Sequence, residues 1–301
     1  TWKKAMRHAG LYINGGGSLI QDVTSRRSLW FYLHNIQAAH KAGCKVQMYG
    51  CGIGPVLREQ HRKLAARVLN ACVDVITLRE PDSQKELQSM GVTRPEVLLT
   101  ADPALTLPAA SDDEIDSVLL RAGIPPRGNY LCFALRNWKG FESKAPLFGQ
   151  AAKYAYETYG LTPVFAAVEK HLDPGAGRLA VAGLDIPHYF LDDAGSAGTI
   201  IGALSRMQAV VSMRLHALIF AAGQGIPLAG VVYDPKVSSF LRYIGQENFA
   251  DLDALTPDLL KSMIDRVAAA PISPEEQEAA VRKLRQTEQV NVETARRLLG
   301  V

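Results

Sequence analysis

Short apolar runs alternate along the chain with longer, helix-like segments. The runs contain few polar residues, which is typical of strands that are buried on both faces. They predict nine strands, at residues 11–14, 45–50, 73–78, 97–100, 130–135, 163–168, 187–191, 209–213 and 228–232. Helical segments lie between them, among them RRSLWFYLHNIQAAHKAG and VLREQHRKLAARVLNAC. This order predicts an α/β fold with parallel sheets that are covered by helices.

A break in this pattern divides the chain. The segment RAGIPPRGNY at residues 121–130 holds two glycines and two prolines, which suit neither a helix nor a strand, and a new strand begins at Tyr130. We therefore expect an N-terminal domain of residues 1–126 and a second domain of residues 127–272. Ser273 and Glu276 match a helix capping box, so residues 273–301 should form a C-terminal helix of about 25 residues.

The overall composition narrows the class of protein. The chain of 301 residues is 48% hydrophobic, and no window approaches the roughly 18 consecutive apolar residues of a membrane span. The formal charge of +3 fits an anionic ligand or a loose contact with a membrane surface, and is too weak to indicate nucleic acid. The four cysteines show no C-x-x-C spacing, which favours a reduced, cytoplasmic protein without a zinc site.

Cationic residues follow several of the predicted strands at their carboxyl ends. In open parallel sheets these ends meet at one edge, where ligands bind. The residues are Arg79, Arg136, Arg214, His216 and Lys236. We expect them to converge on one cleft. Because a cleft of one charge sign attracts ligands of the opposite sign, the ligand should carry more than one negative charge.

Glycines follow the first two strands, in the run Gly15, Gly16 and Gly17 and in the segment GCGIGP at residues 50–55. Glycine has no Cβ to hold a ligand away, and it lets backbone N–H groups face an anion. The first run is therefore a candidate for substrate binding, although a tight turn explains it equally well. It matches neither the dinucleotide fingerprint G-x-G-x-x-G nor the P-loop.

The segment VVSMRLHALIFAAGQGIP joins a buried strand to an apolar helix. His216 falls in the first turn of that helix, where unpaired N–H groups and the helix dipole favour a bound anion. A single histidine at such a position often only packs the turn. The cationic neighbours Arg214 and Lys236 favour a functional role here.

Acidic residues are weaker candidates. Asp102 follows a strand and precedes Pro103, so it fits an Asx turn as well as a site. Asp251 and Asp253 form a D-x-D pattern just before a helix start, where a capping role is favoured. Since the sequence shows no cluster of acidic, cysteine or histidine ligands, we expect no metal and no cofactor requirement.

Five blocks, taken in order, resemble the polysaccharide pyruvyl transferase family. They are INGGGSLIQD, YGCGIGP, ITLREPDSQKELQSMG, LLTADPALTL and VVSMRLHALIFAAGQGIPLAGVVYDPKVSSF. The likeness is strongest to the bacterial CsaB-type enzymes that pyruvylate cell-wall polymers. The family usually opens with a strand and a turn rich in glycine and asparagine. This chain starts with what resembles the end of a helix, so we expect part of the acceptor side to be absent.

The resemblance implies a GT-B-like architecture, in which two Rossmann-like domains face each other across a cleft. It implies an enzyme that transfers pyruvyl from phosphoenolpyruvate to two hydroxyls of one sugar, forming a cyclic ketal and releasing phosphate. The implied acceptor is N-acetylmannosamine in a lipid-linked precursor of a secondary cell-wall polysaccharide, with a role in S-layer anchoring.

The resemblance also assigns site residues. The family's donor-site roles fall on Arg79, Asp102 and the pair Leu215 and His216. Arginine can grip a carboxylate or a phosphate with two hydrogen bonds, so we expect Arg79 to point into the cleft. His216 would hold or protonate the phosphate, and Asp102 would handle hydroxyl protons or orient a partner.

Two other functions stay open. A GT-B glycosyltransferase or a sugar-nucleotide epimerase would share the anion site at the helix start, and Asp192 and Asp193 could bind its ribose. A non-catalytic glycan-binding module would use aromatic platforms, and aromatic residues make up only 7% of this chain.

A lipid-linked acceptor implies a peripheral contact with the membrane surface. We expect this contact to be electrostatic and to involve Arg26 and Arg27 beside the glycine run. A second basic set, Arg58, Arg62, Lys63 and Arg67, lies along one predicted helix and is better explained as a solvated face.

Overall fold

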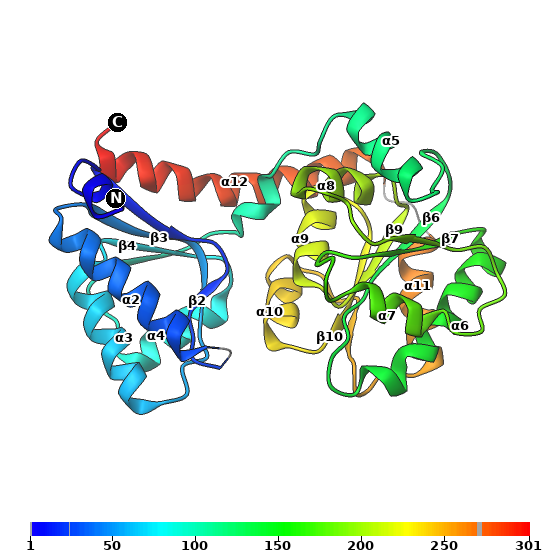
Figure 1. Cartoon of the computed structure of the whole chain (residues 1–301), viewed down its shortest axis with the longest axis horizontal. Helices are drawn as coiled ribbons and strands as arrows, with labels where there is room; N and C mark the ends of the chain where they lie inside the picture. The colour runs from blue at the N-terminus through cyan, green and yellow to red at the C-terminus, as the bar shows by residue number, and fades with distance from the viewer. Residues whose placement is uncertain (1, 24, 270–272) are drawn as a thin grey trace. The chain divides into compact units, whose positions relative to one another are not determined.

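The structure, a computed structural model, describes residues 2–23, 25–269 and 273–301. It consists of two compact units, each built around one parallel sheet (Figure 1). Unit 1 comprises Thr1–Pro103 and Leu284–Val301, and unit 2 comprises Ala104–Lys283.

Unit 1 contains a five-stranded parallel sheet in the order β1-β3-β4-β5, with β2 also paired to β3. Apolar side chains from β3 and β4 pack with the buried faces of the helices, where Leu33 and Leu69 have almost no exposed surface. Its elements in chain order are α1 (Trp2–Met6), β1 (Leu11–Gly15), β2 (Ser18–Ile20), α2 (Arg26–Lys41), β3 (Lys45–Ile53), α3 (Glu59–Cys72), β4 (Val75–Leu78), α4 (Pro81–Met90) and β5 (Glu96–Leu99).

Unit 2 contains a six-stranded parallel sheet in the order β11-β10-β9-β6-β7-β8. Its core joins the buried strands to α6 and α11, and Phe133, Phe141 and Phe148 are fully buried there. The elements are η1 (Pro103–Thr106), α5 (Asp112–Arg121), β6 (Tyr130–Ala134), α6 (Phe141–Tyr159), β7 (Thr162–Ala166), α7 (Pro174–Ala180), β8 (Tyr189–Leu191), α8 (Ala197–Ser205), β9 (Ala209–Ser212), α9 (Leu215–Gly223), β10 (Leu228–Val232), α10 (Pro235–Tyr243), β11 (Phe249–Asp251) and α11 (Pro257–Ala268).

The predicted α/β class with parallel sheets is confirmed. All nine predicted strands are present, with ends displaced by at most about three residues, the scatter expected of pattern-based boundaries. Two strands were missed, β2 and β11, and each has three residues. So short a segment shows no pattern of its own, and its pairing with a neighbouring strand decides its conformation.

Along the chain, the division between the two units falls at residues 103–104, before α5. The sequence had placed it after α5, at residues 126–127. The reason is packing between α5 and α8. A Cβ added at Gly202 would lie 2.3 Å from the Ile115 side chain, so the two helices are in close contact. The Ala110 N–H also donates to the Gly198 carbonyl at 2.9 Å. The glycines and prolines of residues 121–130 mark a loop inside unit 2.

The final helix, α12 (Pro274–Leu299), has 26 residues. Its predicted capping box is present: Ser273 Oγ accepts the Glu276 N–H at 3.2 Å, and Glu276 Oε2 accepts the Ser273 N–H at 3.1 Å. The later part of α12 belongs to unit 1. There Asn291 is fully buried, accepts from the Thr100 hydroxyl at 2.9 Å and donates to the Ala101 carbonyl at 3.0 Å.

Candidate active site

Arg79 directly follows β4 in unit 1, and its guanidinium is held on three sides. Nη1 donates to Asp102 Oδ2 at 2.7 Å, Nε donates to Glu80 Oε2 at 3.1 Å, and Nη2 donates to Ser18 Oγ at 3.1 Å. Only 5% of the residue is exposed. Arg79 and Asp102, which the sequence indicated separately, are therefore bound to each other, and the Arg79 guanidinium is buried among its partners. Its expected orientation into a cleft stays a prediction.

The cluster around Arg79 sets one positive charge against two carboxylates. Burial alone would lower the pKa of Arg79, but Asp102 and Glu80 outweigh it and hold that pKa above its ordinary value. Burial raises the pKa of the Glu80 carboxyl, although Arg79 and a hydrogen bond from Ser83 act in the opposite direction. Two carboxylates thus face one guanidinium in a nearly dry environment.

Glu80 and Ser18 also accept hydrogen bonds from Arg79, and the sequence did not predict either contact. Glu80 occupies the N-cap position of α4, but its side chain makes no capping hydrogen bond and serves Arg79 instead. Ser18 belongs to the missed strand β2. The glycine at position 52 leaves room for both, because a Cβ there would lie 2.7 Å from Ser18 Oγ and 2.9 Å from Glu80 Oε1.

The glycine run connects β1 to β2 in the sheet of unit 1. Gly15 ends β1, where a Cβ would lie 2.9 Å from the Tyr49 backbone oxygen, so this glycine is needed for close approach of two strands. Gly16 and Gly17 adopt φ values of 78° and 70°, which favour glycine. The Gly52 N–H donates to the Gly17 carbonyl at 2.9 Å. These contacts support the turn explanation, and substrate binding by the run stays a prediction.

In unit 2 the predicted cations gather at one edge of the sheet. The order β10-β9-β6 makes three parallel strands neighbours, and Lys236, Arg214 with His216, and Arg136 follow their respective carboxyl ends. The sequence-based expectation of a shared edge therefore holds for these four residues. Arg79 and Asp102 form a separate cluster in unit 1.

Arg136 packs between aromatic rings. Its Nη1 donates to the Tyr233 hydroxyl at 3.0 Å, and its guanidinium carbon lies 4.9 Å from the centroid of the Trp138 ring and 5.4 Å from that of Tyr233. Lys236 Nζ lies 6.0 Å from the Tyr233 ring and 3.1 Å from Asp234 Oδ2. Cation–π contacts orient Arg136 without neutralising its charge, whereas Lys236 also has the Asp234 carboxylate as a partner. Trp138 is 42% exposed, so this group borders solvent.

His216 is exposed in the first turn of α9, as predicted. Leu215 before it is buried, and Arg214 is the N-cap residue. The His216 ring lies 6.0 Å from the ring of Phe220, one turn further along. The N-terminal N–H groups of α9 and the imidazole therefore lie together at the end of β9, an arrangement suited to an anion.

Arg214 is held by a carboxylate that sequence reasoning missed. Its Nε lies 3.2 Å from Oδ2 of Asp173, which is 3% exposed. The same oxygen accepts the N–H groups of Val168 at 3.1 Å and Glu169 at 2.8 Å. Burial raises the pKa of Asp173, although those N–H groups and Arg214 act in the opposite direction. The available signal is an aspartate before a proline at a helix start, a pattern that is common at helix caps and does not by itself indicate a partner for Arg214.

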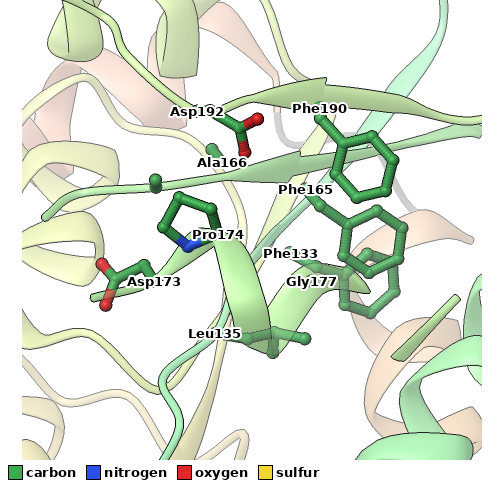
Figure 2. A pocket seen from close by; sticks show the side chains of 10 residues that line it. Phe133, Leu135, Phe165, Ala166, Asp173, Pro174, Gly177, Phe190 and Asp192 are labelled. Atoms are coloured by element: carbon green, nitrogen blue, oxygen red, sulfur yellow. The ribbon is translucent and has the colours of Figure 1, made fainter. Parts of the chain in front are cut away.

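A small pocket lies beside Asp173 (Figure 2). Its walls include Phe133, Phe165 and Phe190. Within the described ranges, Asp173 Oδ1 is buried without a hydrogen-bond partner. Asp192 also lines the pocket, but its carboxylate is already bound by the Arg178 guanidinium at 3.1 and 2.6 Å.

Several structural absences bear on the remaining expectations. Among the described residues, no three or more histidine, cysteine or acidic side chains are gathered as metal ligands would be, and the metal-free reaction stays a prediction. The four cysteines are free and buried. Over the same residues, no helix combines the length and the apolar character that crossing a bilayer requires.

The fold resembles solved GT-B glycosyltransferases and UDP-GlcNAc 2-epimerases. The UDP-GlcNAc 2-epimerase from Methanocaldococcus jannaschii superimposes with a TM-score of 0.60 at 10% identity, over 94% of this chain and 79% of that one. The epimerase from Neisseria meningitidis bound to UDP-GlcNAc gives 0.58 at 11% identity, over 98% and 78%. CalG4, the calicheamicin glycosyltransferase, gives 0.52 at 12% identity, over 97% and 73%. These likenesses define the fold class.

A comparison with protein-family models assigns the chain to a family within this fold class. The model of the polysaccharide pyruvyl transferase family matches residues 1–235, and the chain belongs to this family. It is therefore a transferase. No curated protein sequence matches the chain.

Proposed function

We propose that the protein transfers the pyruvyl group of phosphoenolpyruvate to two hydroxyls of one sugar in a cell-wall polysaccharide precursor. The observation that carries this proposal is the cationic edge of unit 2. Arg136, His216 and Lys236 follow neighbouring strand ends, and His216 is exposed there. Phosphoenolpyruvate offers a matching ligand, since it bears a carboxylate and a phosphate on one short carbon chain.

Each cation has a distinct part in this proposal. Arg136 is held by Tyr233 and Trp138, and no ion pair to it occurs within the described part of the chain. Its charge is thus available to the donor carboxylate. Lys236 and the N-terminal N–H groups of α9 bind the phosphate, with Arg214 and Leu215 shaping the turn. His216 holds the phosphate and protonates it as it leaves.

The reaction balances with these groups. A proton adds to the methylene carbon of phosphoenolpyruvate, and the neighbouring carbon takes on cationic character. A first sugar hydroxyl bonds to that carbon and loses its proton. The carbon–oxygen bond to phosphate then breaks and phosphate leaves, and a second hydroxyl of the same sugar closes the ketal and loses its proton. Of the two hydroxyl protons, one replaces the proton taken up by the methylene carbon, and the other ends on phosphate. The cationic side chains stabilise the negative charge that grows on phosphate.

In the proposed reaction, unit 1 has a structural role near the acceptor. Arg79 and Asp102 are buried, and their cluster connects β2, β4 and the segment after β5. In the proposal this cluster holds the chain around Gly15, Gly16 and Gly17 in the form that meets the acceptor, and Asp102 contributes through Arg79. The proposed acceptor is N-acetylmannosamine in a lipid-linked precursor, and the product serves cell-wall assembly and S-layer anchoring.

A sugar-nucleotide reaction is the second candidate, because the fold neighbours include proteins bound to UDP sugars. In this chain the two acidic residues that would bind a ribose are engaged. Asp192 is paired with Arg178, and Asp193 is paired with Lys170 at 3.2 Å and with the Gly195 N–H. Pyruvyl transfer therefore accounts for the site better.

Phosphate release tests the proposal directly. The purified chain is given phosphoenolpyruvate and a synthetic disaccharide that ends in N-acetylmannosamine, and phosphate and the ketal product are measured together. We expect both in equal amounts, and both reduced about 10²–10⁴-fold with His216→Ala. UDP-GlcNAc and UDP-glucose serve as control donors and should stay intact. Turnover of a UDP sugar, with phosphoenolpyruvate unchanged, would overturn the proposal in favour of the second candidate.

A further inference from the structure

Unit 1 carries large apolar side chains on its surface where α2 begins and where β3 leads into α3. Val23 is 57% exposed, Trp30 52%, Phe31 59% and Leu57 70%. These four residues, together with Arg26, Arg27 and Arg58, are called the α2 face below. Single exposed apolar residues need no explanation, but several on adjoining segments mark an interaction surface.

The helix α2 has two distinct sides. Leu29, Leu33 and Ile36 are buried in the core of unit 1. Arg27, Trp30, Phe31 and His34 are exposed, and their spacing of three, four and seven residues places them on one stripe along the outside. The aromatic pair thus lies on the solvent side, one turn from the basic start of the helix.

A buried contact between Asp22, which precedes α2, and His61, in α3, ties these two segments together. Asp22 Oδ2 lies 2.7 Å from His61 Nδ1, and the His61 ring lies edge-on to Trp30 with 6.2 Å between their centroids. Asp22 also accepts the N–H groups of Leu57 at 2.7 Å and Arg58 at 3.2 Å. The loop that presents Leu57 and Arg58 is therefore fixed close to Trp30. Figure 1 shows α2 and α3 side by side.

The charge of the α2 face is of one sign. Residues 23–58 contain no aspartate or glutamate. Arg26 and Arg27 stand in the first turn of α2, where the helix dipole disfavours cations. Over the described ranges, neither they nor Arg58 forms an ion pair. The arrangement costs helix stability, and an anionic partner outside the molecule would offset that cost.

The neighbouring basic residues behave differently. Arg62 pairs with Glu86 at 2.8 Å, and Lys63 pairs with Glu59 at 3.4 Å. These two residues belong to the set that the sequence indicated as a solvated helix face, and both have acidic partners.

We propose that the α2 face docks on an anionic lipid surface, with Trp30, Phe31 and Leu57 entering the headgroup region and Arg26, Arg27 and Arg58 contacting lipid phosphates. The inference rests on the proposed function, because a lipid-linked acceptor would be presented at such a surface. Exposed aromatic and aliphatic side chains among arginines suit the boundary between headgroups and acyl chains. The contact is thus both electrostatic and apolar, not electrostatic alone as the sequence suggested.

Vesicle binding tests the inference. The full chain is sedimented with phosphatidylcholine vesicles and with vesicles that also contain phosphatidylglycerol. We expect binding to the anionic vesicles, weakened at least about tenfold by the double change Arg26→Gln and Arg27→Gln. Trp30→Ser with Phe31→Ser should abolish the part of the binding that survives high salt. Arg67→Gln and Leu120→Ser are matched controls elsewhere on the surface and should bind like the unchanged protein.

Other outcomes would overturn the inference. Equal binding to both vesicle types, or no effect of either double variant, would remove the α2 face as a lipid contact. Loss of a dimer in Trp30→Ser with Phe31→Ser, without vesicle binding by the unchanged chain, would assign the face to a second copy. Thermal unfolding verifies that the variants are folded. Phosphate release with a soluble acceptor should be unchanged in both double variants, so failure of the proposed function is recognised separately.

Discussion

Arginines follow strand ends in both units, but their surroundings differ. Arg79 in unit 1 is 5% exposed and is bound by Asp102, Glu80 and Ser18. Arg136 in unit 2 is bound by a tyrosine hydroxyl and two aromatic rings. Two carboxylates bind the first guanidinium directly, whereas aromatic rings orient the second, on which the Asp173 carboxylate acts electrostatically without a direct ion pair among the described contacts.

An arginine that follows a strand can therefore serve in two ways, either by stabilising the fold or by attracting a ligand. A buried arginine with its own carboxylates stabilises the chain segments that it connects, and removing it leaves unpaired buried charge. An arginine held by rings is pre-organised and still attracts an anion. We therefore propose that unit 1 provides a framework and that unit 2 provides the cationic site for the donor. Four predictions test this contrast.

The largest effect is expected for His216→Ala. Turnover per folded molecule should fall about 10²–10⁴-fold, because a positioned proton donor and phosphate ligand is lost. The side chain is exposed, so the free energy of unfolding should change by less than about 0.5 kcal/mol.

His216→Gln should keep part of the donor affinity through a hydrogen bond. Calorimetry in two buffers of different ionisation enthalpy should show proton uptake on donor binding. Near-normal turnover would remove His216 from the reaction.

Arg79→Ala should lower the free energy of unfolding by about 3–5 kcal/mol, since Asp102 and Glu80 would lose their buried partner. Urea titration followed by circular dichroism measures the change. Arg136→Ala is the matched control and should cost under about 1 kcal/mol, because the buried Asp173 carboxylate near it keeps Arg214 as its direct partner. Equal losses in the two variants would contradict the contrast between framework and site.

Arg136→Gln and Lys236→Met should each weaken phosphoenolpyruvate binding by about 10–100-fold. A charge-assisted contact contributes about 1.5–3 kcal/mol, which is the basis of this range. Both side chains border solvent, so the folded structure should persist. Donor affinity by calorimetry gives the values, and Arg67→Gln serves as a surface control. Donor affinity left intact in both variants would assign the anion site elsewhere.

The smallest effect concerns pH and Glu80. Its pKa is raised in the folded state by burial. The folded protein therefore binds this proton more tightly than the unfolded chain, and the resulting stabilisation is present at low pH and is lost as pH rises through the folded pKa. Glu80→Gln should remove that dependence. The difference in unfolding free energy between the two proteins, measured from pH 4 upward, reveals it, and a constant difference would disprove the assignment.

Sequence patterns predicted most of the fold and part of the site. Nine strands and the capped start of α12 follow from local rules, because apolar runs and capping residues act over a few positions. The cations of unit 2 were found because strand ends share one edge in a parallel sheet. Glu80 as the partner of Arg79 and Asp173 as the partner of Arg214 were missed, since polar residues at helix starts suit capping equally well.

The sequence by itself determined the alternation of strands and helices, the residue types at each strand end and the family to which the chain belongs. Only the tertiary structure decided which cations are neutralised and which stay available. Asp102 lies 2.7 Å from Arg79 although 23 residues separate them, and Tyr233 reaches Arg136 across 97 residues. Charge compensation depends on burial and on contacts between distant segments, and these exist only once the sheets have formed.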